Sequence, residues 1–257
     1  MTILFSAKPG PHPRSEDLSR TAEVASLFQV AGWLVRDMLP FVAMTARRVV
    51  PAAVRNPARH KEGPVAVPVH GTALLLIDVI NDLAFPGSKI LVEQAEPMAI
   101  RLAALKRRVS AAGIPSIYIN DNFGQWRSDF RRTVAHCVRR GSPGRLVSRR
   151  LRPTARDYFV LKPKHSGFFD TTLDTLLKAL RIRRVLLTGI AGNICVLFTA
   201  NDAYMRDLKI YAPADCIVSN TPTDNEHALQ QIKTALKGNL AASTHLTFDG
   251  PARRRVT

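Results

Sequence analysis

Cysteine is scarce in this chain. The 257 residues include three cysteines, Cys137, Cys195 and Cys216, and no two of them have the Cys-x-x-Cys spacing. An odd number without that spacing predicts neither a disulfide framework nor a cysteine zinc site. Free thiols are typical of proteins in a reducing compartment, so we expect a cytoplasmic protein.

Long apolar runs are also missing. No stretch has the roughly 18 uninterrupted apolar residues of a membrane-spanning helix. The nearest candidate, residues 24–46, is broken by Arg36, Asp37 and Pro40 and begins too late for a signal peptide. Its apolar residues recur at helical spacing, which favours a helix that packs on a partner or a neighbouring subunit. Contact with a membrane surface is the alternative interpretation.

Acidic residues are sparse in residues 101–156. Fourteen lysines and arginines stand there against two aspartates, Asp121 and Asp129, and the whole chain has a formal net charge of +17. The positive electrostatic potential of such a segment attracts nucleic acid or an anionic substrate. No nucleic-acid motif with interleaved aromatic residues accompanies the charge, which favours a solvated basic face instead.

The composition divides the chain into three regions. Residues 1–67 hold the amphipathic segment and a proline-rich arm, because residues 51–71 contain four prolines and two glycines with little periodicity. Residues 68–250 are the expected compact domain, and the hydrophobic content of 46% is enough to fill a core. Residues 251–257 form a basic tail.

Short apolar runs alternate with helical segments through the expected domain. Near-continuous apolar strands separated by helices are typical of a parallel sheet that is buried on both faces. We therefore expect a doubly wound α/β fold with a mostly parallel, six-stranded sheet and helices on both faces. The expected strands are 72–78, 114–120, 157–162, 184–190, 208–215 and 244–249, and the expected helices are 92–112, 171–180, 195–206 and 224–240.

Polar residues follow the carboxyl ends of several of these strands. Open parallel sheets bind ligands outside those ends, where the loops of neighbouring strands converge. Asp78 ends the first expected strand, Asp121 follows the second, and Lys162 ends the third. The glycine-rich turn 189–195 follows the fourth and leads to Cys195. We expect all of them on one edge of the sheet.

Cys195 has two interpretations. A lone cysteine after a glycine-rich bend is commonly a small core residue, and Asp78 and Lys162 taken singly could be a turn former and a solvated strand end. A nucleophilic thiol needs a base, a cation or a helix N-terminus that favours its thiolate, and Asp78 and Lys162 could supply the first two. Backbone N–H groups at the same bend could hold a developing oxyanion. The joint placement favours the catalytic interpretation.

Three stretches of the sequence resemble a known family. Residues 73–88, 114–130 and 160–216 are similar, in order and spacing, to the isochorismatase-like cysteine hydrolases. That group includes nicotinamidases, N-carbamoylsarcosine amidase and isochorismatase itself. The resemblance spans residues 70–248 and implies the doubly wound fold already expected from the strand pattern.

The resemblance implies a catalytic triad of Asp78, Lys162 and Cys195. In the family's usual scheme the thiolate attacks an amide carbonyl, the aspartate carries the proton to the leaving amine, and water hydrolyses the thioester. The resemblance also implies a cis peptide bond between Ile190 and Ala191, with the N–H groups of Ala191 and Cys195 as oxyanion donors. Family members are commonly dimers or tetramers, so we expect a homo-oligomer that acts on a small molecule.

Candidate substrate contacts surround this triad. They are Asp121, Phe123, Trp126, Ile190 and Gly192. The arginines of segment 127–156 occupy the position of the family's lid, and a guanidinium pairs bidentately with a carboxylate, so they could close over an acidic substrate. The alternative is that they lie on a subunit surface.

Departures from the family pattern narrow the choice among the family's subgroups. Nicotinamidases carry an Asp-x-His pair and further histidines that bind a metal, whereas residues 121–123 read Asp-Asn-Phe and the nearest histidine is His136. We therefore expect no metal and no organic cofactor. The family often has Gln where this chain has Ile80, and Thr where it has Gly192, which puts in doubt one hydrogen bond near the oxyanion site.

The sequence therefore predicts a cysteine-dependent hydrolase of a small amide, ureido or related C–N substrate, acting through a thioester. One alternative is hydrolysis of a vinyl ether, as in enzymes that split isochorismate, although these usually lack the cysteine that stands here at Cys195. The other alternative is a non-catalytic protein that binds an anionic partner through its basic segment.

Overall fold

A computed structural model gives the fold and describes residues 63–122 and 129–249. These residues belong to one compact unit, 61–257. The expected amphipathic helix, most of the proline-rich arm and the basic tail lie outside the described residues, and so do the candidate contacts Phe123 and Trp126.

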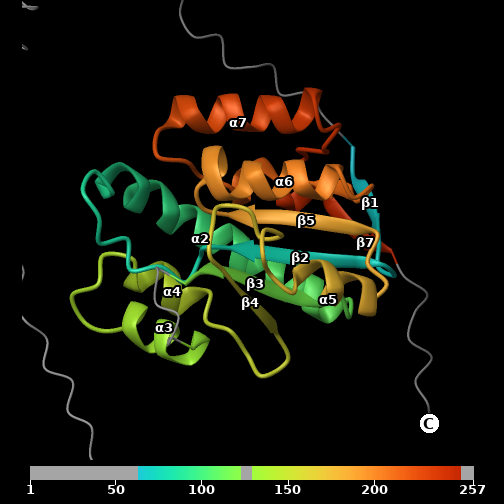
Figure 1. Cartoon of the computed structure of the whole chain (residues 1–257). Helices are drawn as coiled ribbons and strands as arrows, with labels where there is room; N and C mark the ends of the chain where they lie inside the picture. The colour runs from blue at the N-terminus through green and yellow to red at the C-terminus, as the bar shows by residue number, and fades with distance from the viewer. Residues whose placement is uncertain (1–62, 123–128, 250–257) are drawn as a thin grey trace, which may run out of the picture. The chain divides into compact units, whose positions relative to one another are not determined.

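A five-stranded sheet forms the centre of the described domain (Figure 1). Its strand order is β4-β3-β2-β5-β6, and every neighbouring pair is parallel. All residues of β2 and all but one of β5 are buried, as expected for central strands covered on both faces. The strands are β2 (Thr72–Ile77), β3 (Ser116–Asp121), β4 (Tyr158–Lys162), β5 (Arg184–Gly189) and β6 (Lys209–Tyr211). The predicted doubly wound α/β class is confirmed.

The sixth expected strand does not join this sheet. It forms β7 (Leu246–Asp249), which pairs in parallel with β1 (Val65–Pro68) in a separate two-stranded sheet. β1 comes from the end of the stretch that the sequence suggested was a linker. The place beside β6 is taken by Asn239, which bridges Tyr211, so the residues that follow pair with β1 instead.

Alternate residues of β2 enter two separate cores. Leu74 and Leu76 belong to the core beneath α2, α3 and α4, whereas Leu75 and Ile77 belong to the core beneath α5, α6 and α7. The helices are α2 (Lys89–Ala111), α3 (Phe130–Cys137), α4 (Arg145–Arg150), α5 (Leu173–Ala179), α6 (Leu197–Tyr204) and α7 (Pro222–Thr234). Within the described ranges, no helix combines the length and apolarity that a membrane span requires.

The loop after β2 is held from two sides. Asn120 Nδ2, on β3, donates a hydrogen bond of 2.6 Å to the carbonyl of Ile80. Ser148 Oγ, on α4, accepts from the N–H of Asn81 at 3.2 Å and donates to its carbonyl at 3.1 Å. Gly144 packs so closely that a Cβ there would lie 2.1 Å from the carbonyl oxygen of Asn81. The arginine-rich segment thus supports the loop that leads from the sheet to α2.

Candidate active site

Lys162 connects Asp78 and Cys195 at the carboxyl edge of the sheet. Its Nζ lies 2.9 Å from Asp78 Oδ2 and 3.4 Å from Cys195 Sγ. Lys162 ends β4, Asp78 follows β2, and Cys195 lies in the turn after β5, so three strands bring together residues far apart in the sequence. The lysine side chain is fully buried and Asp78 is 5% exposed. The three residues that the sequence singles out are in contact.

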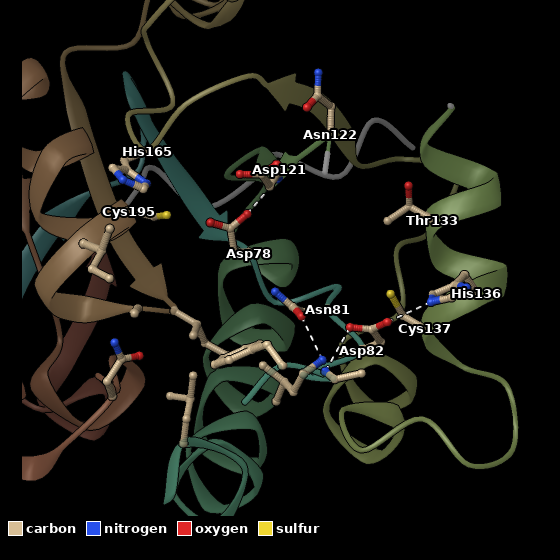
Figure 2. A pocket seen from close by; sticks show the side chains of 18 of the residues that line it. Asp78, Asn81, Asp82, Asp121, Asn122, Thr133, His136, Cys137, His165 and Cys195 are labelled. Carbon is tan, nitrogen blue, oxygen red and sulfur yellow. Dashed lines mark hydrogen bonds and ion pairs between the residues drawn. The ribbon is translucent and has the colours of Figure 1, made fainter. Parts of the chain in front are cut away.

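Asp121 fixes Asp78 from the other side (Figure 2). The backbone N–H of Asp121 donates a hydrogen bond of 2.8 Å to Asp78 Oδ1, and its own Oδ2 lies 3.5 Å from Lys162 Nζ. Asp78 has a φ of 48°, in the left-handed region that aspartate tolerates better than most residues. Both oxygens of the Asp78 carboxylate therefore have partners, and its orientation is set.

Burial governs the protonation of these groups. Burial raises the pKa of Asp78 above its ordinary value, and the charge of Lys162 only partly offsets this effect. Burial alone would lower the pKa of Lys162, but Asp78 and the other nearby anions outweigh it and raise that pKa. Burial, and next the charge of Asp78, raise the pKa of Cys195 to about 12, although Lys162 acts in the opposite direction. The free site therefore holds a charged lysine and a protonated thiol at neutral pH.

The turn that carries Cys195 is a single π-helical turn, Gly192–Val196, which leads directly into α6. It follows a cis peptide bond between Ile190 and Ala191, where the resemblance implies one. The N–H of Ala191 has no hydrogen-bond partner among the described residues. Cys195 lies within the first turn, where backbone N–H groups begin without helical partners. Ala191 and Cys195 both line the same cavity.

Thr199 ties this turn to the loop after β4. Its Oγ1 donates a hydrogen bond of 2.7 Å to the carbonyl of Cys195 and accepts one of 2.9 Å from the N–H of Gly167. The same loop carries His165, whose ring lies 5.4 Å from that of Phe198 on α6. The position of the thiol is therefore coupled to the loop that follows Lys162.

Gly192 is enclosed, and a second hydroxyl supports its turn. A Cβ at Gly192 would lie 2.6 Å from Ser219 Oγ and 2.7 Å from Asn225 Oδ1. Ser219 Oγ accepts a hydrogen bond of 3.0 Å from the N–H of Asn193 and donates one of 2.9 Å to Asn225 Oδ1. A hydroxyl does bond the turn although Gly192 replaces the family's threonine. Sequence reasoning missed Ser219, because no local pattern connects it with the turn.

A cavity of about 1400 Å³ opens in front of Asp78 and Cys195 (Figure 2). Asp78, Asp121 and Cys195 line one end, together with the expected substrate contact Ile190 and the expected oxyanion donor Ala191. Lys162 and Gly192 are not among the lining residues, because Lys162 is buried beneath the carboxylates and Gly192 packs against Ser219. The lining also includes Asn81, Asp82, Leu83, Ala84, Phe85, Leu91, Asn122, Arg132, Thr133, Ala135, His136, Cys137, His165, Ile194 and Asn220.

One face of α3 forms the opposite wall of the cavity. The sequence placed segment 127–156 over the site as a lid but did not predict this helix within it. His136 Nε2 lies 2.8 Å from Asp82 Oδ2 across this end. A detectable signal was present, because Asp129 caps the helix by accepting from the N–H of Arg132. His165 lies three residues after Lys162, which ends β4, and it lines the cavity. It could have been predicted as a site residue, because polar residues that follow parallel strands gather at one edge of the sheet. In the described part of the chain, no three His, Cys, Asp or Glu side chains converge as metal ligands.

The chain is similar to curated proteins over most of the described domain. Residues 72–244 match the family model described as Isochorismatase domain. An uncharacterized isochorismatase family protein of Bacillus subtilis, YaaI, is 43% identical over 164 residues, which is 64% of this chain and 90% of that protein. A ureidoacrylate amidohydrolase of Methylorubrum extorquens, RutB, is 30% identical over 218 residues, which is 71% of this chain and 83% of that protein.

Solved structures share the fold. An isochorismatase-like hydrolase from Alkaliphilus metalliredigens superposes with a TM-score of 0.55 and 27% identity, over 67% of this chain and 95% of that one. N-carbamoylsarcosine amidase from Thermoplasma acidophilum superposes with a TM-score of 0.54 and 24% identity, over 70% of this chain and 99% of that one. The chain therefore belongs to the isochorismatase family and is a hydrolase of that family.

Proposed function

We propose that this protein is a cysteine-dependent amidohydrolase that cleaves a C–N bond of a small amide or ureido substrate through a thioester. The observation that carries the proposal is the buried Lys162 ammonium, which lies 2.9 Å from Asp78 Oδ2 and 3.4 Å from Cys195 Sγ at the end of a large cavity. The similarity to an amidohydrolase named for ureidoacrylate supports the ureido class.

Asp78 is the general base of the first step. The thiol of Cys195 is protonated at rest, because burial and the charge of Asp78 raise its pKa to about 12. Its proton passes to Asp78 as the sulfur bonds to the substrate's carbonyl carbon, so no free thiolate accumulates. The positive charge of Lys162 stabilises the negative charge that develops on the sulfur during the attack.

Backbone N–H groups stabilise the tetrahedral intermediate. The carbonyl oxygen becomes an oxyanion and accepts hydrogen bonds from the N–H groups of Ala191 and Cys195. Asp78, now protonated, gives its proton to the leaving nitrogen. The C–N bond breaks, an amine or ammonia departs, and the acyl or carbamoyl group stays on Cys195 as a thioester.

Water completes the cycle at the same residues. Asp78 takes a proton from a water molecule, and the hydroxide forms a bond to the thioester carbon. The same two N–H groups hold the second oxyanion. The C–S bond then breaks, the sulfur regains its proton from Asp78, and the product leaves as a carboxylic or carbamic acid.

Trapping the thioester tests this function. Acid quenching during turnover of an amide or ureido substrate should leave an acyl or carbamoyl adduct on the peptide that contains Cys195, detected by mass spectrometry. Cys195→Ala should abolish the adduct and the turnover, whereas Cys216→Ala should retain both, since Cys216 is buried and does not line the cavity. Unchanged turnover in Cys195→Ala would refute the proposal.

A further inference from the structure

We propose that Arg132 binds a carboxylate of the substrate at the α3 end of the cavity and thereby selects amides or ureido compounds that carry an acidic group. This inference rests on the function proposed above and adds a substrate class to it. Residues 101–156 contain fourteen lysines and arginines. Among the described residues, Arg132 is the only lysine or arginine that lines the cavity.

The guanidinium of Arg132 has no partner within the described ranges. Its backbone N–H donates a hydrogen bond of 2.8 Å to Asp129 Oδ1, but its side chain makes neither a hydrogen bond nor an ion pair there. Two other basic groups, one in the lining and one beneath it, have anionic partners. His136 pairs with Asp82, and Lys162 lies beneath Asp78 and Asp121. Among the described lining residues, Arg132 is therefore the one arginine or lysine, and its guanidinium has no anionic partner there.

The geometry of α3 points this cation at the cavity. Arg132 and His136 are four residues apart and therefore share one face of the helix. Thr133 and Cys137 repeat the same spacing, and all four residues line the cavity. The cap of the helix uses the backbone of Arg132 and not its side chain, so the guanidinium is available for a ligand.

The two ends of the cavity differ in charge. At the catalytic end, the carboxylates of Asp78 and Asp121 face one ammonium, that of Lys162, which leaves one excess negative charge. A substrate carboxylate is repelled there and attracted by Arg132. A guanidinium also offers two parallel N–H donors that match the two oxygens of a carboxylate. The neutral amide or ureido group then faces Cys195, as hydrolysis requires.

Binding to an inactive variant tests recognition separately from chemistry. β-Ureidopropionate and isopentylurea have similar shapes and differ in the presence of a carboxylate. Their affinities for the Cys195→Ala protein are measured by calorimetry, and the Arg132→Ala change is then added. We expect β-ureidopropionate to bind more tightly than isopentylurea, and its affinity to fall by about 10- to 100-fold without Arg132. The affinity for isopentylurea should be unchanged.

Matched variants complete the experiment. Arg131→Ala removes an exposed, neighbouring arginine that does not line the cavity and should leave both affinities unchanged. Arg132→Lys should retain part of the preference, since it keeps the charge and loses the paired donors. Circular dichroism checks that each variant is folded. Equal binding of the two probes, binding of neither, or an equal loss in Arg131→Ala overturns the proposal.

The two proposals fail in different ways. A carboxylate preference that depends on Arg132, together with no thioester on Cys195, would refute the catalytic mechanism and leave the recognition site intact. A thioester formed equally well with charged and uncharged substrates would refute the role of Arg132 and leave the mechanism intact.

Discussion

Asp78 and Cys195 share the ammonium of Lys162, whose Nζ lies 2.9 Å from Asp78 Oδ2 and 3.4 Å from Cys195 Sγ, and the negative charge of Asp78 raises the pKa of the thiol. Asp78, the proposed general base, thus also stabilises the protonated form of the resting thiol. Lys162 opposes this effect but does not overcome it. A resting, protonated thiol is protected from oxidation and metal ions, which both react with the thiolate.

Asp78→Asn should separate thiol reactivity from turnover. Removing the charge lowers the pKa of Cys195, so alkylation by iodoacetamide at constant pH should accelerate by about tenfold for each unit of that decrease. Turnover should fall by about 10²- to 10⁴-fold, because the general acid/base is lost. Asp82→Asn, which changes a carboxylate paired with His136, is the control and should leave the alkylation rate unchanged. Slower alkylation in Asp78→Asn would contradict the assigned electrostatics.

The pH dependence of kcat/KM should report the ionisation of Asp78. The base must be ionised to accept a proton, and burial raises its pKa above the ordinary 3.8, so activity should decline with a midpoint above that pH as the pH is lowered. The pKa of Lys162 is raised from 10.5, so the lysine should produce no loss of activity below that pH. Initial rates between about pH 4 and pH 8 measure the acid side. A midpoint at or below 3.8 would be inconsistent with Asp78 as the base.

Gly192→Ala should destabilise the protein by about 1 to 3 kcal/mol, because the new methyl group overlaps Ser219 Oγ, Asn225 Oδ1 and a methyl group of Ile217. The penalty should be smaller in a Ser219→Ala background, since one of the three overlaps is gone. Denaturant unfolding of the two single variants and the double variant measures this coupling. Gly63→Ala meets no atom within 4 Å and serves as the neutral control. Strict additivity would show that Gly192 and Ser219 do not contact each other.

Ser148→Ala should loosen the loop between β2 and α2. The serine is fully buried, and its hydroxyl bonds both the N–H and the carbonyl of Asn81, so its loss leaves two backbone groups without that partner. We expect a loss of about 1 to 3 kcal/mol in unfolding free energy. KM should rise as well, because Asn81 lines the cavity. Ser142→Ala removes a longer bond of 3.3 Å to the carbonyl of Asp82, which Gly144 also contacts, and should have a smaller effect.

The edge that brings Asp78, Lys162 and Cys195 together could be predicted from the sequence, because it follows from the topology of a parallel sheet. Parallel strands end on one side of a sheet, so the residues that follow them must meet there. Asp78 and Lys162 directly end apolar runs, and the turn to Cys195 follows another. The pairing of the last expected strand could not be predicted, because it depends on Asn239 occupying the edge beside β6.

The wall formed by α3 was harder to predict, because the many arginines in this segment obscure the apolar spacing of the helix. The apolar residues of α3 are spaced by three and four, as Phe130, Val134 and Cys137 show, but arginines dominate that part of the chain. The contact between Ser219 and the turn at Gly192 depends on long-range packing and leaves no local trace. The protonation states depend on the burial of Lys162, which no strand pattern reveals.

The pairing of β1 with β7 places the first and last described strands side by side, away from α3 and α4 (Figure 1). Val65 is the partner of Leu246, and Pro68 is the partner of Asp249. Because the pair is parallel, the end of β7 lies beside the end of β1, so a linker to the start of β1 has to run back along the strands and needs roughly a dozen residues. New termini could then lie at an open turn such as Gly141. The arrangement of Asp78, Lys162 and Cys195 thus does not depend on where the chain begins and ends, and a circularly permuted domain retains every residue that lines the cavity.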